Sequence, residues 1–378
     1  MSQSLAESRA GGSSDDRFRA LLDRTCELTE QVFAPRANEA DRAAGPPAEN
    51  IRCLAEAGLL GLTTPARNGG HEAPGSVVRE YREILAAACG LTTFVELQHL
   101  GACGMIARGT NDGLKEAILP ELARGSRLAG LAFSHLRRPG PPTMRTEPRG
   151  DTLVFNGTAP WLTGWGLMDD AVLGGTLPDG RLVYVLAPLA EGPALQASPP
   201  MQLCAMNASA TVSITCRDFV VGPERFIRTL TLADMAVDDR PGVLNYASMS
   251  FGVAWGAIRL LRELAEARNS ADLAGAATAL DSELANARDQ VGVCAERTAE
   301  PDYLEHALPL RAWAIELGVR AAHTAVTASG GSANSRDHTA QRLFREAMVY
   351  TLTAQTRELQ ITTLHRLAER GALATASA

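Results

Sequence analysis

The sequence predicts an α+β fold in which a helical section, a section of short strands and a second helical section follow one another. Apolar residues recur at three- and four-residue spacing through the first third of the chain. A period of two appears in the middle, most clearly over Ala210–Phe219, and helical spacing returns from about Leu230. Because strands and helices occupy separate parts of the chain, the order indicates an α+β layout and excludes a Rossmann alternation.

The first helical section is predicted to span residues 17–128. Its helices are expected over residues 18–32, from 51 to a stop near 58–61, over 77–90 and 91–109, and from a cap at 111–112 to 122. Pro35 follows the first of these helical patterns, and the turn-rich patch Pro65–Pro74 follows the second. Residues 1–16 are polar and rich in Ser, Gly and Asp, so we expect a disordered tail there.

The middle section, residues 129–229, is predicted to hold the strands. The Gly/Pro cluster Pro139–Pro142 marks the end of the helical pattern. Strand-like runs follow at 152–156, 170–177, 182–187 and 210–219. In the last section, residues 230–378, helices are expected over 249–267, 271–298, 308–328 and 338–370. Small residues on the first of these, including Gly252 and Gly256, indicate close packing of helices.

Composition narrows the classes of function. The chain has 378 residues, 46% of them hydrophobic and 21% charged, which is ordinary for a globular protein. A net charge of -7 argues against nucleic acid as a main partner, and no apolar run is long enough to span a membrane. The N-terminus lacks the apolar core of a signal peptide. Seven cysteines without a CxxC pair predict no metal site and reduced, mostly buried thiols in a cytoplasmic protein.

Four local motifs resemble those of the acyl-CoA dehydrogenase family. The longest is Gly330–Gln360, which resembles the C-terminal signature of that family. Leu54–Gly70, Asn156–Thr163 (NGTAPWLT) and Asp218–Phe226 (DFVVGPERF) are similar to further family motifs and occur in the expected order. The resemblance implies an N-terminal helical domain, a middle β-barrel domain and a C-terminal four-helix bundle. It also implies FAD, an acyl thioester carried by CoA or a carrier protein, and a homodimer or homotetramer.

The resemblance also assigns flavin contacts. Trp161 corresponds to an aromatic ring beside the isoalloxazine, Thr163 to the group that meets flavin N5, and Ser134 to a hydroxyl at the pyrimidine edge. The family's remaining cofactor-binding positions are Gly330, Gly331 and Thr356. Without the surrounding motif, Trp161 reads as a core aromatic, and Thr163 and Ser134 read as strand-end or turn residues.

Several positions depart from the family pattern. Laid against the signature without a gap, the position of the catalytic glutamate is Gln341, and an amide cannot take a proton from carbon. Gly140 replaces a serine of the phosphate-side loop, with Arg137-Arg138 as a substitute anion binder, and Gln355 replaces the glycine before Thr356. An alternative site for the glutamate falls near Asn245, next to Tyr246. Standard dehydrogenation with Gln341 as the base is therefore not expected.

Three functions remain open from the sequence. The first is a flavin oxidoreductase with an atypical site for an acyl thioester or a related secondary metabolite, in which Gln341 faces the substrate and Tyr246 and His99 serve as acid or base. The second is a reduced-flavin monooxygenase, since Ala340-Gln341-Arg342 resembles that branch and His99 stands where a histidine steadies a peroxide. His99 is alternatively a core histidine. The third is a flavin-free enzyme or an acyl-binding protein.

Overall fold

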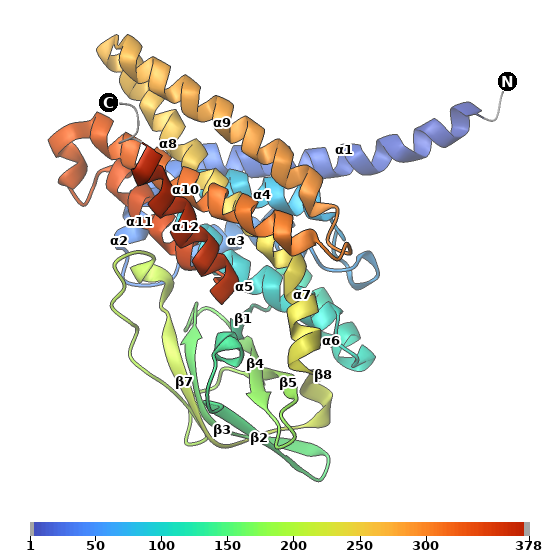
Figure 1. Ribbon diagram of the computed structural model, residues 1–378. Coiled ribbons are helices and arrows are strands. Elements are labelled where there is room, and N and C mark those ends of the chain that lie inside the picture. Colours follow the sequence, from blue (N-terminus) through green and yellow to red (C-terminus); the bar gives the residue numbers. More distant parts are fainter. Residues whose placement is uncertain (1–3, 374–378) are drawn as a thin grey trace. The chain divides into compact units, whose positions relative to one another are not determined.

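The computed structural model describes the backbone of residues 4–373 and the side chains of residues 16–368 (Figure 1). Contacts between residues divide the chain into two compact units. The first unit comprises the chain up to Glu39, Gly75–Gly90 and the chain from Asp239. The second comprises Ala40–Pro74 and Leu91–Asp238. The helices of the predicted N-terminal section are thus shared between the two units, and the three-domain division stays a prediction.

The first unit is helical. Most of its helices come from the last third of the chain: α8 (Ala247–Arg268), α9 (Ala271–Ala295), α10 (Tyr303–Ser329), α11 (Thr339–Leu352) and α12 (Arg357–Leu373). Two helices from the beginning of the chain complete it, α1 (Ser4–Leu28) and α4 (Gly75–Ala88). A π-helical turn, Thr29–Phe33, continues α1 directly into α2 (Ala34–Arg42). Segments far apart in the sequence therefore form one helical bundle.

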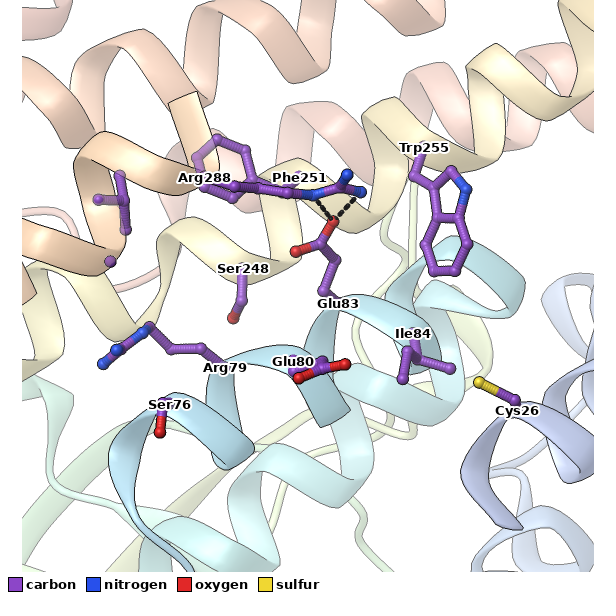
Figure 2. Close-up of a pocket in the computed structure, with 12 residues that line it drawn as sticks. Cys26, Ser76, Arg79, Glu80, Glu83, Ile84, Ser248, Phe251, Trp255 and Arg288 are labelled. Carbon is purple, nitrogen blue, oxygen red and sulfur yellow. Dashed lines mark hydrogen bonds and ion pairs between the residues drawn. The ribbon is translucent and has the colours of Figure 1, made fainter. Parts of the chain in front are cut away.

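Two glycines let α4 and α8 approach closely. A Cβ atom on Gly252 would lie 2.5 Å from the carbonyl oxygen of Glu83, and one on Gly256 would lie 2.7 Å from that of Ala87. Any larger residue would therefore force the helix backbones apart. The close packing expected from these small residues is confirmed. Figure 2 shows the consequence, since side chains of α4 and α8 face each other beside this contact.

The second unit is built on one mixed sheet. Its strands are β1 (Ala129–Ala132), β2 (Met144–Arg149), β3 (Thr152–Leu162), β4 (Asp170–Thr176), β5 (Leu182–Pro188), β6 (Leu195–Ala197), β7 (Val212–Val221) and β8 (Phe226–Leu230). Pairing follows the order β6-β7-β3-β2-β4-β5-β8, and β1 runs parallel to β4. The helices of this unit are α3 (Ala48–Glu56), α5 (Gly90–Ala107) and α6 (Asp112–Arg124), and α7 (Leu232–Asn245) follows the last strand.

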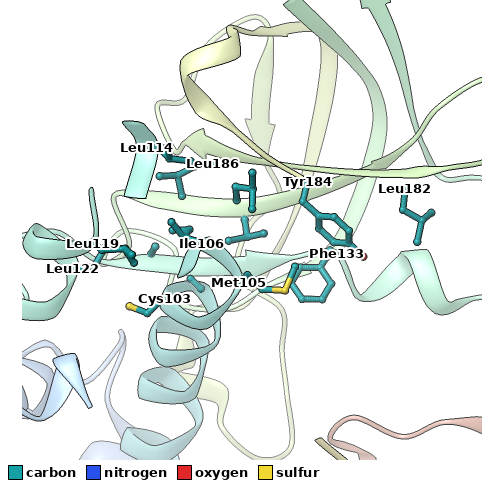
Figure 3. Close-up of a cluster of buried hydrophobic side chains, with 14 of the residues drawn as sticks. Cys103, Met105, Ile106, Leu114, Leu119, Leu122, Phe133, Leu182, Tyr184 and Leu186 are labelled. Carbon is teal, nitrogen blue, oxygen red and sulfur yellow. The ribbon is translucent and has the colours of Figure 1, made fainter. Parts of the chain in front are cut away.

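Alternation along the strands gives the sheet two apolar faces. On β5, Leu182, Tyr184 and Leu186 belong to a cluster that also contains residues of α5 and α6 (Figure 3). The intervening Val183 and Val185 belong to a second cluster on the other face, with residues of β3 and β7. Because successive side chains of a strand point to opposite faces, one strand contributes to both cores. The helices α5 and α6 thus cover one face of the sheet.

Two expectations about the helices were wrong. The polar segment predicted as a disordered tail is part of helix α1 from Ser4 onward, while residues 1–3 lie outside the described chain. The single helix expected over 338–370 is divided into α11 and α12 at Ala354, which adopts a left-handed φ of 52°. Thr356 then accepts a hydrogen bond at Oγ1 from Leu359 N–H (3.2 Å) and so caps the new helix. Among the described helices, none is both long and apolar enough to cross a membrane.

Candidate functional site

Three of the predicted flavin contacts lie together in the second unit. Trp161 is near the end of β3 and Thr163 directly follows that strand, while Ser134 begins a short 3₁₀ turn two residues after β1. The two segments touch, since a Cβ atom on Gly130 of β1 would lie 3.4 Å from the carbonyl oxygen of Thr163. Close packing at Gly130 therefore brings together segments that are about 30 positions apart in the sequence.

Trp161 presents its ring to the surface. Its exposed fraction is 41%, whereas Ala159 and Leu162 on the same strand are fully buried. An apolar aromatic at this exposure is not part of the sheet core, so the core-aromatic interpretation is wrong. The flat face is available for a planar ligand, since aromatic rings favour offset stacking. Ser134 is also exposed.

Thr163 belongs to a buried chain of hydroxyl groups that the sequence did not reveal. Its Oγ1 lies 3.0 Å from Oγ1 of Thr211, which lies 2.7 Å from Oγ of Ser209. All three residues are buried. In the period-two pattern over Ala210–Phe219, Thr211 alternates with the apolar Ala210 and Val212 and so falls on the polar face, which gives no reason to expect burial. These three hydroxyl groups hold the Thr163 side chain in place after β3, because each hydroxyl can both donate and accept a hydrogen bond.

A second residue that sequence reasoning missed is His135, which follows Ser134. Its Nε2 lies 3.0 Å from the carbonyl oxygen of Gly174. Its Nδ1 is buried and has no hydrogen-bond partner among the residues that the structure describes. Burial lowers the pKa of His135, and the nearby Arg138 acts in the same direction. Only its place in the loop that departs from the family pattern could have drawn attention to it.

His99 has the surroundings of a core histidine, and its predicted role as an acid or base stays a prediction. The side chain is fully buried on α5. Its Nδ1 accepts the N–H of Ala129 (3.3 Å), so Nε2 carries the proton and donates to the carbonyl of Leu122 (3.1 Å). Burial lowers the pKa of His99 to about 4. Both ring nitrogens are therefore occupied in joining α5 to α6 and β1.

The remaining predicted residues lie in the first unit. Gln341, on the first turn of α11, is half-buried. Its amide donates from Nε2 to the carbonyl of Arg336 (2.9 Å) and accepts at Oε1 from Nε of Arg345 (2.7 Å). Both ends of the amide are thus engaged with neighbours on the same segment. The role of Gln341 beside a substrate carbon stays a prediction, and these two contacts would have to break or share the amide for it to act there.

Tyr246 and the glycine pair have simpler surroundings. Tyr246 precedes α8, its carbonyl accepts from the buried Arg311 (2.7 Å), and Cζ of Arg82 lies 6.0 Å from its ring centroid. Gly330 has a φ of +64°, which favours glycine, and a Cβ on it or on Gly331 would meet nothing within 4 Å. The two glycines therefore leave open backbone at the end of α10. Thr356 uses its hydroxyl in the α12 cap. Across the described residues, no three His, Cys, Asp or Glu gather as a metal site.

Comparisons with known proteins agree on one family. The family model described as the N-terminal domain of acyl-CoA dehydrogenase matches residues 15–126. The short-chain-specific acyl-CoA dehydrogenase of Clostridium acetobutylicum is 23% identical over 88% of this chain and 93% of its own. The 3-sulfinopropanoyl-CoA desulfinase of Paraburkholderia xenovorans is 23% identical over 91% of this chain and 94% of its own.

Solved structures show the same fold. Butyryl-CoA dehydrogenase from Megasphaera elsdenii superposes with a TM-score of 0.80 at 18% identity, covering 93% of this chain and 98% of the other. The dibenzothiophene monooxygenase TdsC from Paenibacillus sp. A11-2 superposes with a TM-score of 0.78 at 19% identity, covering 93% and 97%. These likenesses establish a helical N-terminal part, a central sheet and a helical C-terminal part. The relatives carry several different activities on this one fold.

Proposed function

The chain belongs to the acyl-CoA dehydrogenase family, and from that premise we propose that it is a flavin-dependent oxidoreductase for an acyl thioester or a related small molecule. The observation that carries the proposal is the exposed ring of Trp161, which stands beside Thr163 and the segment of Ser134. An exposed indole ring offers a flat apolar face on which a planar ligand can stack.

These residues fit a flavin ring. Trp161 would stack on it, the exposed hydroxyl of Ser134 would bond its edge, and Thr163 would offer groups held in place by Thr211. Gly330, Gly331 and Thr356 stay predicted cofactor contacts, and open backbone at the two glycines is compatible with an approaching phosphate. A bound flavin would supply hydride acceptance, and this chain's part is to bind, orient and exclude water around it.

The hydrogen bonds of the three predicted catalytic residues, Gln341, His99 and Tyr246, indicate which of them is the best candidate to transfer a proton. Gln341 and His99 are both engaged in structural hydrogen bonds. Tyr246 is therefore the predicted acid or base whose hydroxyl we propose for proton transfer. That the substrate is a secondary metabolite stays a prediction. The monooxygenase alternative rests on Ala340-Gln341-Arg342 and on His99, and both ring nitrogens of His99 are engaged with backbone groups.

The test is flavin binding by the purified protein. We expect visible flavin absorption, or saturable uptake when FAD, FMN or the reduced flavins are added. Trp161→Ala should weaken this binding about tenfold, because stacking on an aromatic contributes on the order of 1 kcal/mol. The matched control is Val220→Ala, an apolar residue of β7 that is 52% exposed on the same sheet. It should bind flavin like the unchanged protein.

One result would overturn the proposed function, and a second would overturn its cofactor site. A colourless protein that takes up no flavin in either oxidation state would favour the flavin-free enzyme or acyl-binding alternative. Flavin binding that Trp161→Ala and Val220→Ala leave equally strong would remove Trp161 from the cofactor site, although it would keep the oxidoreductase assignment.

A further inference from the structure

The first unit contains a cavity of about 550 Å³ that none of the proposed flavin contacts lines (Figure 2). Residues of α1, α4, α8 and α9 form its wall. Small-molecule sites fall in a range of about 300–1,000 Å³, so its size suits a ligand of modest length. The cavity lies within one compact unit, and its argument is independent of flavin.

The apolar wall comes from one face of α8. Phe251 and Trp255 are four residues apart, so both project toward the cavity from adjacent turns. Phe251 is 2% exposed, while Trp255 is only partly buried. The close contact of α4 with Gly252 sets these rings beside Glu83 and Ile84 of α4. An aromatic or aliphatic body would find apolar contact here.

The polar wall contains a carboxylate that is only half satisfied. Nε of Arg288 donates to Oε1 of Glu83 at 2.6 Å, and Nη2 of Arg288 contacts the same oxygen. Figure 2 shows both lines ending on that one oxygen. Oε2 accepts no hydrogen bond from any residue that the structure describes. The Glu83 side chain is 12% exposed, so Oε2 is the part of this carboxylate that is left open for a donor in the cavity.

The charges around the cavity leave an excess of carboxylate. Arg79 forms an ion pair with Glu296 (3.1 Å) and donates a hydrogen bond to Asn245. Its positive charge is therefore already paired with a carboxylate other than Glu80 and Glu83. The exposed Glu80 and the half-buried Glu83 then line the cavity together with the guanidinium of Arg288, which pairs with Glu83. The surroundings of Cys26 on the α1 side of the cavity are also negatively charged. Burial raises the pKa of the Cys26 thiol, and three nearby carboxylates raise it further: Glu30, Asp23 and Glu80. One negative charge therefore lacks a partner on this side of the cavity.

We propose that this cavity binds a small organic monocation with an apolar body, such as an arylalkylamine. The ammonium group donates to the open Oε2 of Glu83 and neutralises the excess charge that Glu80 contributes. The body packs on Phe251 and Trp255. An anion of the same shape meets repulsion from both carboxylates, and a neutral analogue lacks the charge-assisted hydrogen bond.

The experiment is calorimetric titration of the full chain with three probes of one shape: 2-phenylethylamine, 2-phenylethanol and 3-phenylpropionate. We expect the amine to bind about tenfold more tightly than the alcohol, since a charge-assisted hydrogen bond is roughly twice as strong as a neutral one. The carboxylate should give no measurable binding. Absence of binding by the amine, or equal binding of all three probes, overturns the proposal.

A matched pair of variants places the binding in this cavity. Gly292 and Gly275 both lie on α9, and a Cβ atom on either would meet nothing within 4 Å, so both positions tolerate a side chain. Only Gly292 lines the cavity. Gly292→Leu should remove amine binding, and Gly275→Leu should keep it. If Gly292→Leu binds the amine like the unchanged chain, the amine sits elsewhere and the proposed site is wrong.

Discussion

Arg288 on α9 reaches Glu83 on α4 with two nitrogens, and both nitrogens meet the same carboxylate oxygen. The pair links two helices that lie about 200 positions apart in the sequence. Burial raises the pKa of Glu83, and the guanidinium of Arg288 opposes that rise without cancelling it. The carboxylate is therefore less stable in the fold than in water, even with its partner in place.

This relationship predicts unequal effects for the two halves of the pair. Arg288→Met should lower the free energy of unfolding by about 2 kcal/mol at neutral pH, because an ionised Glu83 is left buried without its cation. Glu83→Gln should cost less than about 1 kcal/mol, since it removes a poorly stabilised charge and leaves a partly exposed guanidinium. Urea unfolding at pH 7 measures both.

The loss of stability in Arg288→Met should also depend on pH. A carboxyl whose folded pKa is raised holds its proton more tightly in the fold, so its contribution to stability increases as the pH falls toward that pKa. The loss in Arg288→Met should shrink on acidification. Asp281→Asn is the control, because the Asp281–Arg262 pair is 39% and 48% exposed and should contribute under about 0.5 kcal/mol. Equal losses in all three variants would contradict the argument.

The contact of α4 with α8 predicts a sharp difference between two glycines. Gly252→Ala places Cβ 2.5 Å from the Glu83 carbonyl and 2.6 Å from Cβ of Ala86, a clash that should cost about 2–3 kcal/mol. Gly275→Ala on α9 meets nothing within 4 Å and should stabilise by about 0.5–1 kcal/mol, as alanine favours helix. Thermal and urea unfolding of the two variants should shift in opposite directions.

Local periodicity was a good guide to the elements and a poor one to their ends. Alternation over Ala210–Phe219 predicted a strand that the structure places at Val212–Val221, and the small residues of α8 predicted its close packing. The break at Ala354 was not visible, because nothing in an apolar spacing reports a left-handed backbone in a residue other than glycine. The helical start of α1 was missed because its composition is polar.

Candidate site residues were predictable only where one strand or turn carries them. Trp161 and Thr163 share the end of β3, so a local motif located both. The hydrogen bonds of His99 were not predicted, because its partners, Leu122 and Ala129, come from later segments that no spacing within α5 identifies. The burial of Thr211 was not predicted for a related reason. Alternation identifies the polar face of a strand but does not report whether another segment covers that face.

The buried hydroxyl chain predicts a cost for removing its central member. Thr211→Val leaves the hydroxyls of Thr163 and Ser209 without a partner and should destabilise the chain by about 1–3 kcal/mol. Thr215→Val on β7, the strand that Thr211 directly precedes, is the matched control, because its 3.1 Å contact with Thr158 is only partly buried. It should cost under about 1 kcal/mol. If urea unfolding shows that Thr211→Val and Thr215→Val lower the free energy of unfolding equally, the hydroxyl groups of Thr211 and Ser209 do not hold Thr163.

His99 predicts a loss of stability in mild acid. Burial lowers its folded pKa to about 4 from an ordinary value of 6.5, so below 6.5 the unfolded chain binds the proton more tightly. Stability attributable to His99 therefore falls as the pH drops from about 6.5 to about 4. Between pH 7 and pH 5 the loss should be about 2 kcal/mol, which follows from a shift of this size at 1.4 kcal/mol per unit.

The comparison that isolates this effect uses His99→Gln and the unchanged chain. Glutamine can accept from Ala129 and donate to Leu122 without titrating, so the His99 variant should lose about 2 kcal/mol less than the unchanged chain on going to pH 5. A His99 variant with an unchanged pH dependence would mean that the ring is not held neutral by its two backbone partners. It would then be available for proton transfer, and the monooxygenase alternative would be strengthened.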